Sequence, residues 1–265
     1  MVSTNEMAEV NAAKNTKMKK IAPTACPNGM LINTWGIVIN KRDFGEADRY
    51  ITVYTENFGK IVFLLKGIRK SKKRELNSVD VLTLSKFTFY KKGEVYTASN
   101  FLGVDSFMEI KGNLENLSLS LYILAILNDI LVENNRKKSL YQITIKTLNY
   151  LKSSVDRRNN YILLGYYLYY LIKDEGLKID MGEGENFSYE KSRFLLENER
   201  YTYKISHEEK EIVELFVAGK VRNIIEGRYL FEDIERVVTL FEKYLSFHLG
   251  VQSKLKNYIM GVEND

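Results

Sequence analysis

The sequence predicts an α+β, multidomain protein in which a five-stranded OB-fold barrel precedes an all-α helical domain with a short inserted hairpin. Three observations lead to this fold class. Short segments rich in Val, Ile, Thr, Tyr and Phe run from residue 32 to about residue 102. After residue 112, Leu and Ile recur at helical spacings of three and four. Only two prolines occur in the 265 residues, which favours long uninterrupted helices.

The strands of the barrel are expected at residues 32–39, 48–55, 60–66, 82–90 and 94–101. The turns ENFGK and YKKGEV place Gly59 and Gly93 where tight hairpins need a positive φ angle. Because alternate strand positions point inward, about half of the aromatic residues here should fill the barrel and the rest should face solvent. These aromatic residues are Phe44, Tyr50, Tyr54, Phe87, Phe89, Tyr90 and Tyr96.

The helices are expected to begin after Gly112. A stripe of Leu114, Leu117, Leu121 and Leu124 marks the first, and Ile143, Ile145, Leu148 and Leu151 mark the second less cleanly. Further helices should lie near 158–175, 207–218 and 230–249, the second of these with a capping box between Ser206 and Glu209.

The stretch YILLGYYLYYLI at 161–172 is shorter than the roughly 17 residues that a membrane-spanning helix needs. We therefore expect a buried helix and no membrane association. Its tyrosines should pack in the core. The alternative is that they form the wall of a groove for a partner peptide.

These patterns divide the chain into a leader at 1–29, an OB-fold domain at 30–106 and a helical domain at 107–265, with the insert at about 176–205. The leader is polar and has no apolar block of the secretory kind, so we expect it to be disordered. The single cysteine, Cys26, excludes an internal disulfide and any multi-cysteine zinc site. It fits a reducing cytoplasm.

A dense group of basic residues follows the third expected strand. Lys66, Arg69, Lys70, Lys72, Lys73 and Arg74 occur with no acid among them, although the net charge of the chain is only +5. Each Lys or Arg that neutralises a phosphate releases a counterion, so this loop predicts nucleic-acid binding without sequence preference. With Arg42, Arg49 and Lys60 these residues form the predicted DNA-binding set. The alternative is a merely solvated loop.

The segment RDFGEADR mixes Arg42 and Arg49 with three carboxylates, Asp43, Glu46 and Asp48. Ion pairing that fixes this loop is favoured over a metal-binding cluster. No catalytic pair is expected from His207 and His248, and no phosphate-binding Gly-x-x-x-x-Gly-Lys loop or Ser-His-Asp order occurs. We therefore expect no enzymatic activity.

Two stretches carry a resemblance to a known family: GIVINKRDFGEADRYITVYTENFGKIVFLLKGIRKSKKR at 36–74 and YLSFHLGVQSKLKNYI at 244–259. Together with the order of elements over about residues 30–259, they resemble the RecO family of bacterial recombination mediators. This resemblance implies a cytoplasmic, nucleoid-associated protein that binds single- and double-stranded DNA and anneals complementary strands. It also implies that the protein helps to load RecA, with RecR, onto DNA coated with single-stranded DNA-binding protein.

The resemblance further implies that the helical domain receives the acidic, Phe-ended tail of single-stranded DNA-binding protein. Such a pocket needs an apolar floor and a cationic rim. Candidates for the rim are Arg136, Lys137, Lys138, Lys152, Arg157 and Arg158.

One departure from the family concerns zinc. Many members carry two Cys-x-x-Cys pairs in the inserted hairpin, whereas here Leu196 and Glu199 occupy the second pair and no cysteine lies near Met181. We therefore expect no cofactor, with packing of Phe187, Phe194 and Leu196 in place of the metal. Two other functions stay open: an RNA-binding OB-fold protein with a helical interaction domain, and a nuclease that uses Asp43, Glu46 and Asp48.

Overall fold

The computed structural model describes residues 29–71 and 75–259. Within them, β1 (Ile32–Phe44), β2 (Asp48–Thr55), β3 (Gly59–Leu65), β4 (Leu84–Lys92) and β5 (Val95–Asp105) close a barrel in the order β1-β2-β3-β5-β4. The β3–β5 pairing is parallel and the other pairings are antiparallel. This is the strand order of the OB-fold, so the predicted fold class is confirmed. The short 3₁₀ helices η1 (Ile68–Lys70) and η2 (Leu76–Val79) connect β3 to β4.

The interior of the barrel is apolar because inward and outward residues alternate along each strand. In β3, for example, Ile61, Phe63 and Leu65 are buried, whereas the residues between them are partly exposed. Of the seven aromatic residues predicted for this region, Phe87 and Phe89 belong to the core cluster inside the barrel. Tyr54 is also fully buried, but it packs on the helices outside the barrel.

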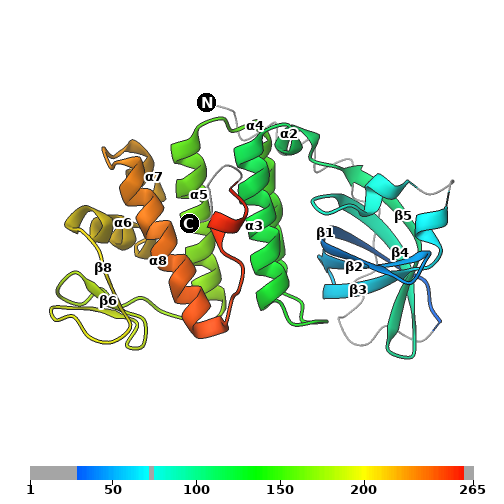
Figure 1. The fold of residues 1–265 in the computed structure, drawn as a ribbon, viewed down its shortest axis with the longest axis horizontal. Coiled ribbons are helices and arrows are strands. Elements are labelled where there is room, and N and C mark those ends of the chain that lie inside the picture. The colour runs from blue at the N-terminus through cyan, green and yellow to red at the C-terminus, as the bar shows by residue number, and fades with distance from the viewer. Residues whose placement is uncertain (1–28, 72–74, 260–265) are drawn as a thin grey trace.

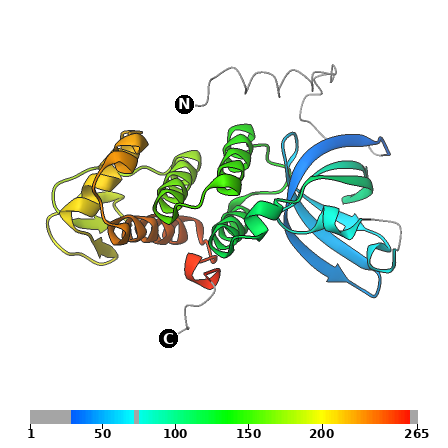
Figure 2. The same cartoon turned by 90° about the horizontal axis from the view of Figure 1, so that it is seen from above.

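The helical region extends from the barrel along the long axis of the molecule (Figure 1). Its helices are α2 (Met108–Lys111), α3 (Leu114–Ile130), α4 (Lys138–Ser153), α5 (Arg157–Asp174), α6 (His207–Val217), α7 (Val221–Glu226), α8 (Phe231–Leu249) and η3 (Leu255–Asn257). Seen from above, the barrel stands at one end and α6 and α7 at the other (Figure 2). The capping box predicted for Ser206 and Glu209 is present at the start of α6.

The insert is larger than the predicted hairpin. Strands β6 (Asn186–Ser188) and β7 (Arg193–Leu195) form the hairpin, and β8 (Thr202–Lys204) pairs with the other edge of β6. Phe187 and Phe194 are buried with ring centroids 5.1 Å apart, as predicted. The prediction for Leu196 is wrong, because its side chain is 72% exposed. Tyr244 of α8 packs on Phe187 instead, at 5.3 Å.

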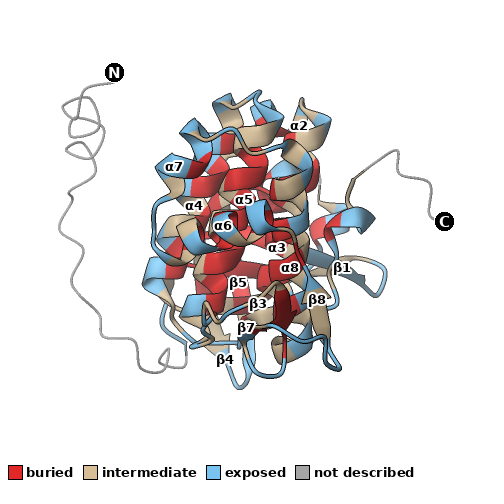
Figure 3. Ribbon diagram, turned by 90° about the vertical axis from the view of Figure 1, so that its left-hand side faces the viewer, coloured by how far each residue is buried: buried red, intermediate tan, exposed pale blue. Residues whose placement is uncertain are grey.

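Helix α3 is buried on more than the one face that its leucine stripe predicts. Leu114 is 54% exposed, whereas Tyr122 and Ile123 are buried between the stripe positions. The reason is that α3 contacts β1 of the barrel as well as α4, α5 and η3. Buried residues are concentrated on the helices in the middle of the molecule (Figure 3).

The tyrosine-rich segment forms α5, and three of its five tyrosines are buried in the core as predicted, whereas Tyr166 and Tyr170 are partly exposed and pack against it. Tyr161 and Tyr167 are fully buried, and Tyr169 is 8% exposed. Among the described helices, none is both long and apolar enough to cross a membrane.

The barrel and the helices share one hydrophobic cluster, which includes Ile37 and Tyr54 of the barrel. The Tyr54 hydroxyl donates to the carbonyl oxygen of Lys137 at 2.8 Å, and its ring packs edge-on against Tyr141 at 5.4 Å. Burial raises the pKa of the Tyr54 hydroxyl, which therefore remains a donor. The outer surface of the barrel at this end is thus closed by the helical region.

Candidate nucleic-acid interface

Two loops at the other end of β1, β2 and β3 are joined by ion pairs. The Asp43 carboxylate lies 2.7 Å from Arg49 Nε and 3.4 Å from Arg69 Nε. The hydrogen bond from Arg49, with the charges of Arg49 and Arg69, holds the pKa of Asp43 below its usual value. The backbone N–H of Gly67 donates to Asp48 at 2.7 Å. The β1–β2 turn therefore positions the start of the basic loop.

Two further contacts complete this connection. The Arg69 guanidinium donates to the carbonyl oxygen of Gly45 at 3.0 Å, and Lys70 Nζ lies 3.0 Å from Glu46. The Lys70 side chain remains 64% exposed. The three carboxylates of this motif are thus engaged with the basic loop, and in residues 29–71 and 75–259 no group of His, Cys, Asp or Glu is arranged to hold a metal ion. The predicted pairing within the motif is confirmed for Arg49 with Asp43, whereas the guanidinium of Arg42 lies over the ring of Tyr50.

An aromatic pair, of which Phe44 is exposed and Tyr50 is partly exposed, lies beside these loops on the outer face of the barrel. Arg42 and Tyr50 are direct partners across β1 and β2, with the guanidinium 5.7 Å from the ring centroid. Phe44 packs edge-on against Tyr50 at 5.2 Å and is 52% exposed. Ring faces next to cations are the combination that binds single-stranded nucleic acid.

The predicted basic residues do not all lie together. One group lies at the end of the barrel formed by the β1–β2 turn and η1: Arg42, Arg49, Arg69 and Lys70. Lys66 lies between β3 and η1, two residues before η1 begins. Lys60 is the second residue of β3, six residues before Lys66, which is about 20 Å along an extended strand. Its ammonium donates to the carbonyl oxygen of Asn128 at 2.9 Å. Lys72, Lys73, Arg74 and Cys26 lie outside the described residues.

Two other basic residues of the barrel, Lys41 and Lys86, were not in the predicted set. Lys41 precedes Arg42 and pairs with Asp80 at 2.6 Å. Lys86 is exposed on β4 opposite Trp35 of β1. An alternating polar pattern in LSKFTFYKK marks Lys86 as outward-facing, but nothing in the sequence places β4 beside β1.

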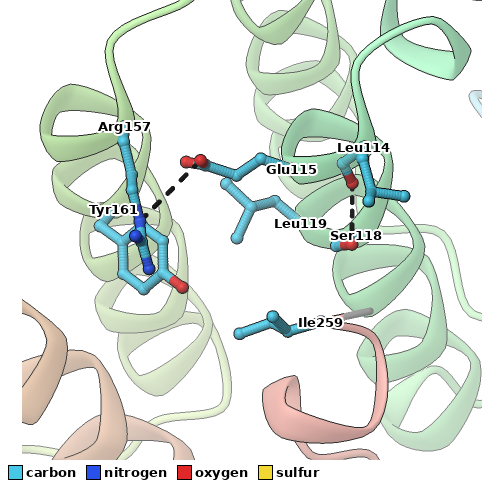
Figure 4. A pocket seen from close by; sticks show the side chains of 7 residues that line it. All are labelled: Leu114, Glu115, Ser118, Leu119, Arg157, Tyr161 and Ile259. Atoms are coloured by element: carbon cyan, nitrogen blue, oxygen red, sulfur yellow. Dashed lines mark hydrogen bonds and ion pairs between the residues drawn. The ribbon is translucent and has the colours of Figure 1, made fainter. Parts of the chain in front are cut away.

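A pocket of about 260 Å³ opens between the first turns of α3 and α5 and the C-terminal segment (Figure 4). Arg157 and Glu115 point toward each other across it, with Nε and Oε2 3.9 Å apart. Burial raises the pKa of the Glu115 carboxyl, and its Oε1 atom has no hydrogen-bond partner among the described residues. The lining is completed by Leu114, Ser118, Leu119, Tyr161 and Ile259.

Of the six basic residues predicted as rim candidates, Arg157 lines this pocket. Its guanidinium lies 4.5 Å from the ring centroid of Phe231, which holds it at the pocket edge. Lys138 is exposed at the start of α4. The remaining four make other contacts: Arg136 with the Glu56 carbonyl, Lys137 with Asp174, Lys152 with Asp105, and Arg158 with the carbonyls of Ile224 and Gly227.

The barrel, its paired loops and the attached helices define an α+β protein of the OB-fold class. The model of the domain "Recombination protein O N terminal" matches residues 30–107. The chain is 29% identical over 243 residues to the DNA repair protein RecO of Acetivibrio thermocellus, covering 86% of this chain and 93% of that protein. It is 24% identical over 252 residues to RecO of a Thermoanaerobacter species, with 88% and 99% covered. For RecO of Halalkalibacterium halodurans the identity is 21% over 242 residues, with 86% and 94% covered.

These similarities extend through both the barrel and the helices. The chain belongs to the RecO family of DNA repair and recombination proteins.

Proposed function

We propose that this protein is a non-enzymatic recombination mediator that binds single- and double-stranded DNA without sequence preference through the basic end of its barrel. The observation that carries the proposal is the connection of the η1 loop to the β1–β2 turn. Ion pairs through Asp43 and Glu46 hold Arg69 and Lys70 beside the exposed ring of Phe44. Cations at fixed positions next to ring faces can follow a phosphate backbone while bases stack.

Such a surface supports annealing of complementary strands. Two strands repel each other through their phosphates, and a cationic surface screens that repulsion. No covalent step is needed, and Asp43 and Glu46 act here as ion-pair partners of the basic side chains, while Asp48 accepts from the backbone N–H of Gly67. With RecR, the protein would then help to load RecA onto DNA coated with single-stranded DNA-binding protein.

The α3–α5 pocket is the receptor that we propose for the acidic, Phe-ended tail of single-stranded DNA-binding protein. Leu119, Tyr161 and Ile259 offer an apolar surface, and Arg157 offers a cation for the tail's carboxylates. Replacement of Arg157 with Gln should weaken binding of the tail peptide in a fluorescence-anisotropy titration. Lys146→Gln, an exposed charge on α4, is the matched control.

The DNA-binding proposal is tested by the salt dependence of affinity. Removal of Lys70, Lys72, Lys73 and Arg74 by substitution with Ala should reduce the slope of log affinity against log salt by roughly 0.7 for each lost single-strand contact. A variant with Lys146, Lys178, Lys220 and Lys256 changed to Ala loses the same charge from other exposed positions. An equal reduction in both variants would remove the η1 loop from the DNA surface.

Three further measurements separate the alternatives. Equal or tighter binding of matched RNA oligomers, with no capture of RecR, would favour an RNA-binding protein. Cleavage of labelled DNA with Mg²⁺ or Mn²⁺ that is lost in Glu46→Ala would indicate a nuclease. All of these experiments use the full chain, because Tyr54 and Ile37 of the barrel are buried against the helices and would be exposed in a barrel fragment.

A further inference from the structure

A second surface of rings and cations lies on β8 and α8, at the end of the molecule opposite the barrel (Figure 1). Lys243 Nζ lies 4.3 Å from the ring centroid of Tyr203, and the Arg236 guanidinium lies 5.8 Å from the same ring. Tyr201 packs against Phe247 at 5.5 Å. Lys243 and Phe247 are four residues apart on α8, so their side chains share one helix face. These residues therefore form one continuous surface, the β8–α8 surface.

Two rings of this surface are open to solvent, and the ring of Tyr203 is partly exposed. Tyr201 is 47% exposed and Phe247 is 43% exposed. Phe247 also stacks on Tyr189, with centroids 5.9 Å apart and ring planes 29° apart. This stacking fixes the orientation of the Phe247 ring, so its exposed side is a preformed contact area.

The charged groups that lie over the rings of Tyr201 and Tyr203 are cations. Arg236 pairs with Glu209, a buried carboxylate that also belongs to the capping box of α6. Arg200, Lys204 and Lys243 form no ion pair with any described residue, and all three are exposed. The Arg200 guanidinium instead lies 4.7 Å from the centroid of the Tyr201 ring. Long flexible side chains of this kind can move from a ring to a phosphate while the ring accepts a base.

We propose that the β8–α8 surface is a second binding site for single-stranded nucleic acid. The inference deepens the proposed function and rests on it, because a protein that anneals strands gains from holding two of them at once. An acidic peptide would also be attracted to the cations. Flat exposed rings beside unpaired cations, however, match bases that alternate with phosphates along an extended strand.

The test is a count of oligonucleotides bound per chain by native mass spectrometry, with an oligothymidylate of about eight nucleotides, within the site size of one OB-fold. The wild-type chain should bind one and then two oligomers. The variant Arg200→Ala/Lys204→Ala/Lys243→Ala should bind only one. Lys146→Ala/Lys178→Ala/Lys220→Ala, which loses equal charge from exposed positions elsewhere, should still bind two.

The barrel variant Lys70→Ala/Lys72→Ala/Lys73→Ala/Arg74→Ala separates the two proposals. It should retain one oligomer, held by the β8–α8 surface, and combination with the β8–α8 variant should abolish binding. If the wild-type chain binds no oligomer, the proposed function itself fails. If it binds one, and the barrel variant alone abolishes that binding, the second site is refuted and the proposed function stands.

A substitution that keeps apolar volume but removes the ring faces tests the stacking. The double substitution Tyr201→Leu with Phe247→Leu should weaken the affinity for the second oligomer about five- to 150-fold for each stacked base that is lost. Unchanged affinity in this variant would contradict stacking on these rings. Loss of affinity for an acidic peptide in the Arg200/Lys204/Lys243 variant, with both oligomers retained, would assign the surface to a protein partner and overturn the proposal.

Discussion

The junction between the barrel and the helices makes Gly59 the most sensitive of the hairpin glycines to substitution. Gly59 has φ +69°, and a Cβ atom added there would lie 2.0 Å from the carbonyl oxygen of Asn135. Ordinary contact begins at 3.4 Å, so the two backbones would have to separate by about 1.4 Å, from 3.4 − 2.0. That separation would break the hydrogen bond from Asn134 N to the Lys60 carbonyl, which measures 2.9 Å.

We expect Gly59→Ala to lower the free energy of unfolding by about 2 to 5 kcal/mol. The left-handed backbone costs an alanine about 1 to 2 kcal/mol, and overpacking against a backbone atom adds about 1 to 3 kcal/mol. Gly93→Ala is the matched control, because Gly93 also occupies a hairpin turn with φ +59° but meets nothing within 4 Å. It should cost only the backbone penalty.

The assay is thermal denaturation of both full-length variants, followed by circular dichroism. At about 3 °C per kcal/mol for a chain of this size, Gly93→Ala should lower Tm by about 3 to 6 °C and Gly59→Ala by about 6 to 15 °C. Equal shifts in the two variants would refute the close approach of the β2–β3 turn to the segment between α3 and α4.

Three other substitutions test the described contacts. Tyr54→Phe removes the donor to the Lys137 carbonyl and should cost about 1 kcal/mol in urea denaturation, since that carbonyl keeps its bond from Tyr141 N. Asn116→Ala removes donors to the carbonyls of Leu151 and Ser154, at 2.8 and 2.7 Å, and should cost about 1 to 3 kcal/mol by the same method. Because burial raises the pKa of Glu115, its contribution to stability is present at low pH and is lost as the pH rises through the folded-state pKa. Glu115→Gln should therefore raise Tm by at most a few degrees at pH 7 but not at pH 4, and a gain at both would contradict this assignment.

The barrel and most helices follow from local pattern. Alternating residues in LSKFTFYKK predict β4, and Ser206 with Glu209 predicts the start of α6, because both signals depend on residues that are neighbours in sequence. Helix α7 was not predicted. Its six residues, VRNIIE, are too few to show the helical periodicity of apolar residues.

Part of the candidate nucleic-acid interface could likewise be predicted from local sequence, and part could not. The sequence identifies the cations of residues 66–74 and the opposite charges of Asp43 and Glu46. It also indicates pairing within the RDFGEADR motif, and the structure extends that pairing to Arg69 and Lys70 across the barrel end. Lys60 shows where prediction of the site from sequence fails. In the sequence it resembles Lys66, since both are lysines at the ends of the same strand. In the structure, however, its ammonium donates to the carbonyl oxygen of Asn128, at the junction between the barrel and the helices.

The sequence by itself determined the class of fold, the family signature and the basic loop, because periodicity, turn residues and charge density are local properties of the chain. Only the tertiary structure decided which surfaces remain open. Tyr54 and Tyr50 occupy the same face of β2, but Tyr54 is covered by α4 whereas Tyr50 stays beside Phe44 at the basic end. Likewise Arg200 and Lys243 are 43 residues apart, from 243 − 200, and come to one surface only because β8 packs on α8. Burial depends on which elements pack together, and that is set by contacts between residues far apart in the chain.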